Sequence, residues 1–182
     1  MVPGTRGGIA GAMTLLALLV YLLLAGGDGE DGGSTGTAAG EGRGGGPAGR
    51  PVTAQVVRVV DGDTIEVALD GGTDDVRYIG VDTPETVKPG EPVQCYGPEA
   101  SEFNHELVDG ETVRLVFDRE LRDVYDRLLA YVYVGDRFVN AALVREGYAR
   151  TLEIPPNTSR ADQLATLEQR AGEHGLGLWG AC

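Results

Sequence analysis

The chain has 182 residues, which is enough for one domain of ordinary size plus an appendage. Its formal net charge is −13, and Lys88 is the one lysine among 15 basic residues. Such an acidic surface repels nucleic-acid phosphates at low salt, which argues against a high-affinity nucleic-acid-binding protein more than against an enzyme. We interpret the acidity as an adaptation to a salty medium, where the Debye length shrinks to about 3 Å at 1 M salt. A merely soluble acidic surface is the alternative.

An uncharged segment, residues 7–27, follows Arg6, and from Met13 to Ala25 it is almost entirely apolar. Its length lies between the roughly 7–15 apolar residues of a secretory signal and the roughly 20 of a spanning helix. We therefore predict export, with residues 1–27 as either a cleaved signal peptide or a membrane anchor, and slightly favour the anchor. Arg6 on the short side would leave the rest of the chain outside the membrane.

Residues 28–50 are rich in Gly, with Ser, Thr, Ala, Asp and Glu between the glycines. A segment of this composition cannot bury enough apolar surface to order itself. We predict a flexible linker over residues 28–50 and one folded domain over residues 51–182.

Alternation of apolar and polar residues from residue 51 onward predicts a series of β-strands. Asp61-Gly62 and Gly71-Gly72 are turn signals between the first three strands. The strands are expected at Val56–Val60, Ile65–Leu69, Val76–Val81, Val113–Phe117 and Leu129–Val134.

Helices are expected after the third strand and after the fifth. The first begins at Gly97, because Pro98 suits the first helical position and a single apolar face follows it. Phe138–Glu146 and Ser159–Glu173 are the other two helical segments. The element order predicts an α+β, mainly β fold: a five-stranded OB-type β-barrel decorated by about three helices.

Two short runs carry most of the chemistry, Asp61-Gly62-Asp63-Thr64 and Val81-Asp82-Thr83-Pro84-Glu85-Thr86. They supply four carboxylates in turn-like segments, with Arg77 between them and Arg127 downstream. Carboxylate oxygens suit a hard divalent cation and guanidinium forks suit a phosphate. The combination therefore indicates phosphodiester chemistry. Each run alone is more often a plain turn, and each arginine alone a surface charge.

Together with three further segments, these runs resemble the staphylococcal nuclease (thermonuclease) family. The similarity extends from about Thr53 to Trp179. It is specific because the segments agree in order and approximate spacing. The segments are Val60-Asp61-Gly62-Asp63-Thr64, Val81-Asp82-Thr83-Pro84-Glu85-Thr86, Tyr96-Gly97-Pro98-Glu99-Ala100, Tyr125-Asp126-Arg127 and Val139-Asn140-Ala141-Ala142-Leu143-Val144.

The resemblance implies a calcium site. It assigns Asp63 and Asp82 as direct Ca²⁺ ligands and Thr83 as a ligand through its backbone carbonyl, with Asp61 one layer further out. Oxygen ligands of this kind fit Ca²⁺, which tolerates irregular geometry.

The resemblance also implies a catalytic set. Glu85 would activate or orient the attacking water, while Arg77 and Arg127 would hold the scissile phosphate, and Tyr125 would contact the substrate. Attack in line with the 5′ oxygen would leave a 3′-phosphate, as in the family.

Some positions depart from the family pattern. Val124 stands where the family has a lysine and Asp126 where it has a glycine, and Leu152 and Ile154 align with two nucleotide-contacting tyrosines. Because stacking on an aromatic ring contributes about 1–3 kcal/mol per base, we expect substrate binding to change more than the chemistry.

Cys95 and Cys182 are the two cysteines of the chain. In an exported protein they can form a disulfide. By closing the long loop between them, it would contribute on the order of 4 kcal/mol to the free energy of unfolding in the chain-entropy model. We favour this disulfide over two unpaired thiols.

The leading hypothesis is an extracellular or cell-surface, calcium-dependent nuclease that acts as a monomer on DNA and RNA, preferring single-stranded or denatured substrate. One alternative is a catalytically weak or inactive OB-fold module that binds nucleic acid. The other is a calcium-stabilised cell-surface domain, for which the two arginines would be superfluous.

Overall fold

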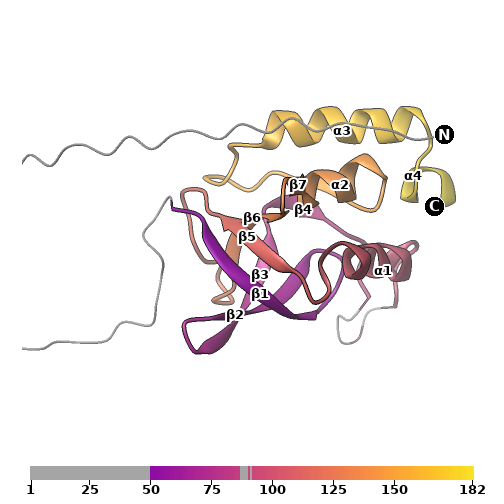
Figure 1. Ribbon diagram of the computed structural model, residues 1–182. Coiled ribbons are helices and arrows are strands. Elements are labelled where there is room, and N and C mark those ends of the chain that lie inside the picture. The colour runs from indigo at the N-terminus through magenta and orange to yellow at the C-terminus, as the bar shows by residue number, and fades with distance from the viewer. Residues whose placement is uncertain (1–49, 87–89, 91) are drawn as a thin grey trace, which may run out of the picture. The chain divides into compact units, whose positions relative to one another are not determined.

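The computed structural model describes residues 50–86, 90 and 92–182 (Figure 1). The predicted leader, residues 1–27, and the linker up to residue 49 lie outside the described residues. Within the part of the chain that is described, no helix is long and apolar enough to cross a membrane.

Five strands form a closed, mixed β-barrel, as the sequence predicts (Figure 1). Their order is β3-β2-β1-β5-β6, and parallel pairing of β3 with β6 closes the barrel. A two-residue strand, β7 (Arg137–Phe138), extends the sheet beyond β6. The barrel strands are β1 (Val52–Val59), β2 (Thr64–Leu69), β3 (Gly72–Tyr78), β5 (Thr112–Val116) and β6 (Leu128–Val134).

The core of the barrel consists of the branched residues that the alternation pattern singles out. Ile65 and Val67 of β2, Val76 of β3 and Val113 and Leu115 of β5 have no exposed surface. β1 begins four residues earlier than predicted, because its first residues pair with β5.

Three helices cover the barrel, followed by one short helical segment. They are α1 (Gly97–Val108), α2 (Val139–Arg145), α3 (Ala161–Glu173) and α4 (Leu178–Ala181). The helix α2 lies between the barrel and α3, and contacts β6 as well as α1 (Figure 1). Its residues from Val139 to Val144 are all buried, which explains why all of them except Asn140 are apolar.

The third predicted strand, Val76–Val81, is wrong as a single element. The structure divides it into β3 and a separate strand, β4 (Gly80–Asp82), which pairs with β8 (Arg150–Leu152) instead of continuing the barrel. Gly80 has φ +80°, a left-handed backbone conformation that favours glycine. The chain therefore leaves the barrel just after Tyr78, and this turn carries Asp82 to the rim.

The C-terminus is joined covalently to the segment before α1. Cys95 and Cys182 form a disulfide with their Cα atoms 6.0 Å apart. Nearby, the guanidinium of Arg150 lies 4.2 Å above the ring of Trp179. These contacts hold α4 against the rest of the domain.

Candidate active site

The turn between β1 and β2 places Asp63 inside the protein. The Asp61 carboxylate accepts a hydrogen bond from the Asp63 backbone N–H at 3.0 Å, which shapes the turn. Asn104 of α1 is fully buried and donates to the Asp61 carbonyl at 2.8 Å, while its side-chain oxygen accepts from Tyr78 at 3.0 Å. The acidic turn is therefore fixed to a helix and a barrel strand.

Arg77 joins the two acidic runs. Its Nη1 lies 2.8 Å from Asp63 Oδ2 and its Nη2 lies 3.1 Å from Asp82 Oδ1. Nη1 also donates to the Val81 carbonyl at 3.0 Å, and the Thr83 N–H donates to Asp63 Oδ2 at 2.8 Å. One half-buried guanidinium thus brings Asp63, Asp82 and the start of the second run together.

The carboxyl of Asp63 lies in an unusual environment. Burial raises its pKa to about 7 against the opposing effect of the Arg77 guanidinium, and the carboxylates of Asp61 and Asp82 raise it further. Asp63 and Asp82 share one guanidinium and Asp61 lies close enough to raise the pKa of Asp63, so this corner of the site carries surplus negative charge. A hard cation would offset that charge, and oxygen atoms are the donors that Ca²⁺ takes, so the residues fit the ion.

No group of three or more His, Cys, Asp or Glu side chains in the described part of the chain has the arrangement of a metal site. Asp63 and Asp82 instead have Arg77 as their shared partner.

Glu85 lies half-buried in the segment that leads toward α1. Its carboxylate accepts from the Thr86 N–H at 2.9 Å. Gln94 holds its backbone on both sides, because its side-chain oxygen accepts from the Glu85 N–H at 3.1 Å and its own N–H donates to the Glu85 carbonyl at 2.9 Å. Gln94 directly precedes Cys95, which forms the disulfide with Cys182, so this segment is tied to the C-terminus.

Arg127 is held by a carboxylate four residues earlier. Asp123 accepts hydrogen bonds from the Arg127 Nε at 2.8 Å, and from the backbone N–H groups of Arg127 and Tyr125 at 3.0 and 2.9 Å. Burial acts to raise the pKa of Asp123, but these hydrogen bonds outweigh it and lower the pKa. The Tyr125 side chain is 77% exposed, and its ring centroid lies 5.4 Å from the guanidinium carbon of Arg127.

Arg77 and Arg127 line the same groove, which has a volume of about 370 Å³. Leu152 and Ile154 form part of its apolar wall, and Tyr125 lines it beside Arg127. Two guanidinium groups and several apolar side chains line this groove together, which suits a ligand with both phosphate and base.

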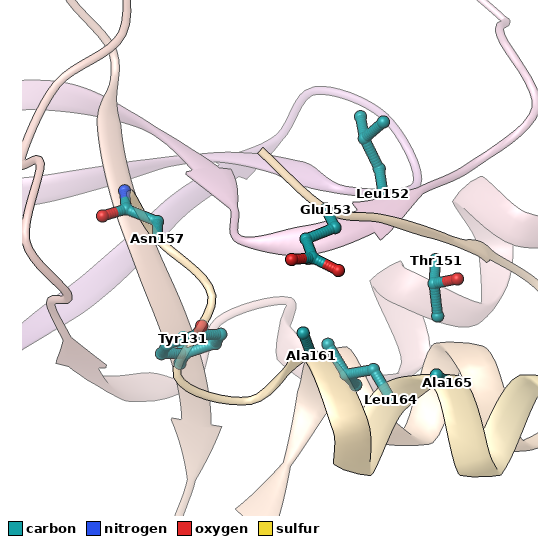
Figure 2. A pocket seen from close by; sticks show the side chains of 9 residues that line it. Tyr131, Thr151, Leu152, Glu153, Asn157, Ala161, Leu164 and Ala165 are labelled. Carbon is teal, nitrogen blue, oxygen red and sulfur yellow. The ribbon is translucent and has the colours of Figure 1, made fainter. Parts of the chain in front are cut away.

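A second, much smaller cavity lies between β8 and α3 and has a volume of about 40 Å³. Figure 2 shows Tyr131, Glu153 and Leu164 around it, with Ala161 and Ala165 of α3. It can hold a water molecule, which needs about 10–15 Å³, but not a nucleotide. The groove that Arg77 and Arg127 line is therefore the candidate site.

Sequence reasoning missed the residues that hold the site in place. Asp123, Asn104 and Gln94 all fix predicted site residues through hydrogen bonds. The sequence offers a weak signal for Asp123 alone, because Asp commonly accepts hydrogen bonds from N–H groups a few residues further along a turn. Asn104 lies 43 residues from its partner Asp61, a separation that no local pattern shows.

Comparison with known proteins agrees with this geometry. The model of the family described as staphylococcal nuclease homologue matches residues 75–181. Thermonuclease of Staphylococcus intermedius is 47% identical over 124 residues, which are 68% of this chain and 74% of that protein. Endonuclease YncB of Bacillus subtilis (strain 168) is 47% identical over 130 residues, 70% of this chain and 62% of that protein. Thermonuclease of Staphylococcus hyicus is 43% identical over 127 residues, 70% of this chain and 75% of that protein.

The family model spans more than half of the chain, and the relatives are 43–47% identical to it. Both findings point to the same family. The chain that carries this acidic turn and these two arginines therefore belongs to the staphylococcal nuclease family.

Proposed function

We propose that the protein is an exported, calcium-dependent nuclease that hydrolyses phosphodiester bonds of DNA and RNA and leaves 3′-phosphate products. The observation that carries this proposal is the shared groove of Arg77 and Arg127, with the carboxylates of Asp63 and Asp82 in contact with Arg77. The names of the relatives, thermonuclease and endonuclease, support it.

The two arginines supply the electrostatic part of the chemistry. Their planar forks hold the oxygens of the scissile phosphate and favour the charge that develops as water attacks phosphorus. Carboxylates hold both guanidinium groups at the groove before the substrate arrives. Glu85 accepts or directs the proton of the attacking water. The bond from phosphorus to the 5′ oxygen breaks, and that oxygen takes up a proton to leave as a hydroxyl, which balances the proton lost by the attacking water. The phosphate stays on the 3′ oxygen.

Asp63 and Asp82, with the carbonyl of Thr83, are the residues that would hold Ca²⁺, and Asp61 would support them through the turn. Bound Ca²⁺ would supply Lewis-acid polarisation and orient water. The excess of carboxylates over guanidinium groups at this corner supports the assignment.

The groove favours a substrate that is recognised without its base sequence. Leu152 and Ile154 offer apolar surface that any base can contact, and such contacts distinguish neither one base from another nor ribose from deoxyribose. Base contact with the groove requires unpaired bases, so single-stranded or denatured nucleic acid is the preferred substrate. We propose that the protein acts as a monomer.

Export rests on the N-terminal sequence and on the cysteines. Residues 1–27 would direct the chain to or through a membrane, residues 28–50 would serve as a linker, and residues 51–182 would form the nuclease outside the cell. The Cys95–Cys182 disulfide supports this location, because disulfides persist in oxidising compartments.

One experiment tests the function. The purified full chain is incubated with denatured DNA and with RNA, with Ca²⁺ or with chelator, across a range of salt concentrations. We expect Ca²⁺-dependent cleavage and product ends that accept a label only after 3′-phosphatase treatment. Binding without cleavage would instead support the nucleic-acid-binding module. Stabilisation by Ca²⁺ with neither binding nor cleavage would support a structural calcium domain.

A further inference from the structure

The chain between β5 and β6 ends in a narrow hairpin over residues 121–129, whose tip carries Tyr125 and Arg127. The Asp123 N–H donates to the Arg127 carbonyl at 3.0 Å, and the Asp126 N–H donates back to the Asp123 carbonyl at 3.1 Å. These bonds define the turn itself. The base of the hairpin is paired with β3 through Leu128 and Leu129, but none of these bonds attaches the tip to β3.

Arg122 provides that attachment. Its Nη1 lies 2.9 Å from Asp74 Oδ1 and its Nη2 lies 2.5 Å from Asp74 Oδ2, which is a two-point contact to β3. Nη1 also donates to the carbonyl of Asp126, and Nε lies 3.7 Å from the Asp126 carboxylate. A single guanidinium therefore connects the tip of the hairpin to the barrel wall. Two parallel N–H···O bonds fix direction as well as distance.

The contact between Arg122 and Asp74 connects the residue before Arg127 with the strand that carries Arg77. Asp126 has φ +68°, a strained conformation for a non-glycine residue, and Arg122 holds its carbonyl. The strand that carries Asp74 also carries Arg77, three residues later. Backbone pairing of Leu128 and Leu129 with β3 places the end of the hairpin, and the clamp at the tip adds the second point that fixes Arg127 relative to Arg77 in the groove.

We propose that Arg122, through Asp74, is a positioning residue that sets the placement of Arg127 against the scissile phosphate. The inference rests on the proposed nuclease function, because it concerns the same groove. The pair is part of the hairpin's attachment, and neither residue lines the groove of Arg77 and Arg127. Arg122 and Asp74 are only about one-third and one-quarter exposed, so water screens their contact less than it screens a free surface pair.

Two single variants of opposite charge separate geometry from electrostatics. Arg122→Ala removes a positive charge and Asp74→Ala removes a negative one, so they change the attraction of a polyanionic substrate in opposite directions. If the clamp acts by positioning, both lower kcat by about 10- to 100-fold on denatured DNA, with KM changed by less than about threefold. The double variant then loses no more than the worse single variant, because the two residues act as one unit. Opposite effects of the two variants on kcat/KM, with kcat unchanged, overturn the proposal.

Arg58→Ala is the matched control. Arg58 pairs with Glu66 at 3.0 Å and lines the same surface hollow as Asp74 and Asp126, but it does not contact the hairpin. We expect it to leave kcat unchanged. Arg122→Lys keeps the charge without the fork, so it should recover only part of the loss. A full recovery by lysine would mean that charge alone matters and would overturn the positioning role.

Amide hydrogen exchange gives a readout that does not depend on activity. In Arg122→Ala, the N–H groups of Asp126 and Arg127 should exchange about tenfold faster, while those of the barrel strand β6 keep their rates. Unchanged exchange at the tip overturns the clamp even if activity falls. A parent protein without nuclease activity overturns the proposed function and with it the catalytic role of the clamp, whereas the exchange rates still decide whether Arg122 holds the hairpin.

Discussion

Arg77 and Arg127 line one groove, but the protein holds them in different ways. The Arg77 side chain is 15% exposed and contacts the carboxylate of Asp63, which is 6% exposed. The Arg127 side chain is 30% exposed and has Asp123 as its partner. Loss of the first arginine leaves a buried carboxylate without its counter-charge, whereas loss of the second does not. The two residues should therefore share a catalytic phenotype and differ in stability.

We expect Arg77→Ala and Arg127→Ala each to lower kcat by about 10³-fold, the effect of removing an arginine that stabilises a phosphoryl transition state. Arg77→Ala should also lower the free energy of unfolding by about 3–5 kcal/mol, because it breaks a buried ion pair. Arg127→Ala should lower it by less than about 1 kcal/mol. Initial rates on denatured DNA and urea unfolding check both parts. Equal stability of the two variants would contradict the assigned burial of Asp63.

The lowered pKa of Asp123 predicts how stability depends on pH. Its folded pKa lies below the ordinary value of about 3.9, so the unfolded state binds more protons in the acid range. The resulting stabilisation is complete above that value and is lost as the pH falls through the folded pKa. In Asp123→Asn, which carries no charge, we expect the stability gap to the parent to be widest above about pH 5 and to narrow in acid. Urea unfolding over a pH series measures this difference in the free energy of unfolding between the variant and the parent. A gap that does not change with pH would contradict the charged hydrogen bonds to Arg127.

How much of the site the sequence reveals depends on how far apart the partners lie along the chain. Asp61 and Asp63 share a four-residue turn, and Asp82 and Glu85 share one short run, so composition and spacing expose them. The hydrogen bonds that hold those residues join distant segments. Asn104 reaches back 43 residues to the acidic turn, and a lone Asn in a helix has no pattern that indicates such a contact.

Among the elements, the barrel strands were predictable because each alternates between a buried and an exposed face. The two-stranded sheet of β4 and β8 was not, since each strand has only three residues and they pair across about seventy positions of sequence. No periodicity develops over three residues. The break at Gly80, which follows the third barrel strand, depends on its positive φ, and the sequence Ile79-Gly80-Val81 does not predict that angle.

Gly80 should be sensitive to substitution for two reasons. Its φ is +80°, and a Cβ there would lie 2.6 Å from Leu164 Cδ1 of α3. Gly71 provides the matched control, with φ +81° and no atom within 4 Å of a Cβ. We expect Gly71→Ala to cost about 1 kcal/mol for the backbone conformation alone, and Gly80→Ala to cost about 1–3 kcal/mol more because the fully buried Leu164 side chain must move. Thermal and urea unfolding compare them. Equal losses of unfolding free energy in the two variants would mean that Leu164 makes room for the new Cβ at no cost.

For the molecule as a whole, the single disulfide closes most of the domain into a loop. Cys95 and Cys182 are 87 residues apart in sequence, and the loop includes all four helices. A covalent link of this length removes many conformations from the unfolded chain, so its effect on stability is larger than that of any one surface ion pair.

We expect the Cys95→Ser/Cys182→Ser double variant to lose about 4–5 kcal/mol of unfolding free energy in the chain-entropy model. Guanidinium unfolding under oxidising conditions measures the loss. The parent unfolded in the presence of a reductant should match the variant under either condition. A reduced parent that keeps its full stability would show that the bridge contributes nothing to the folded state.

The same bridge determines what a protease can achieve. The tip of the 121–129 hairpin is an obvious point of attack, because Val124 is 92% and Tyr125 77% exposed. A cut at that tip lies between Cys95 and Cys182, so the two pieces stay joined as one molecule. The residues before and after the cut also remain paired in the barrel through β5 and β6. A nicked molecule outside the cell would thus keep all of its parts.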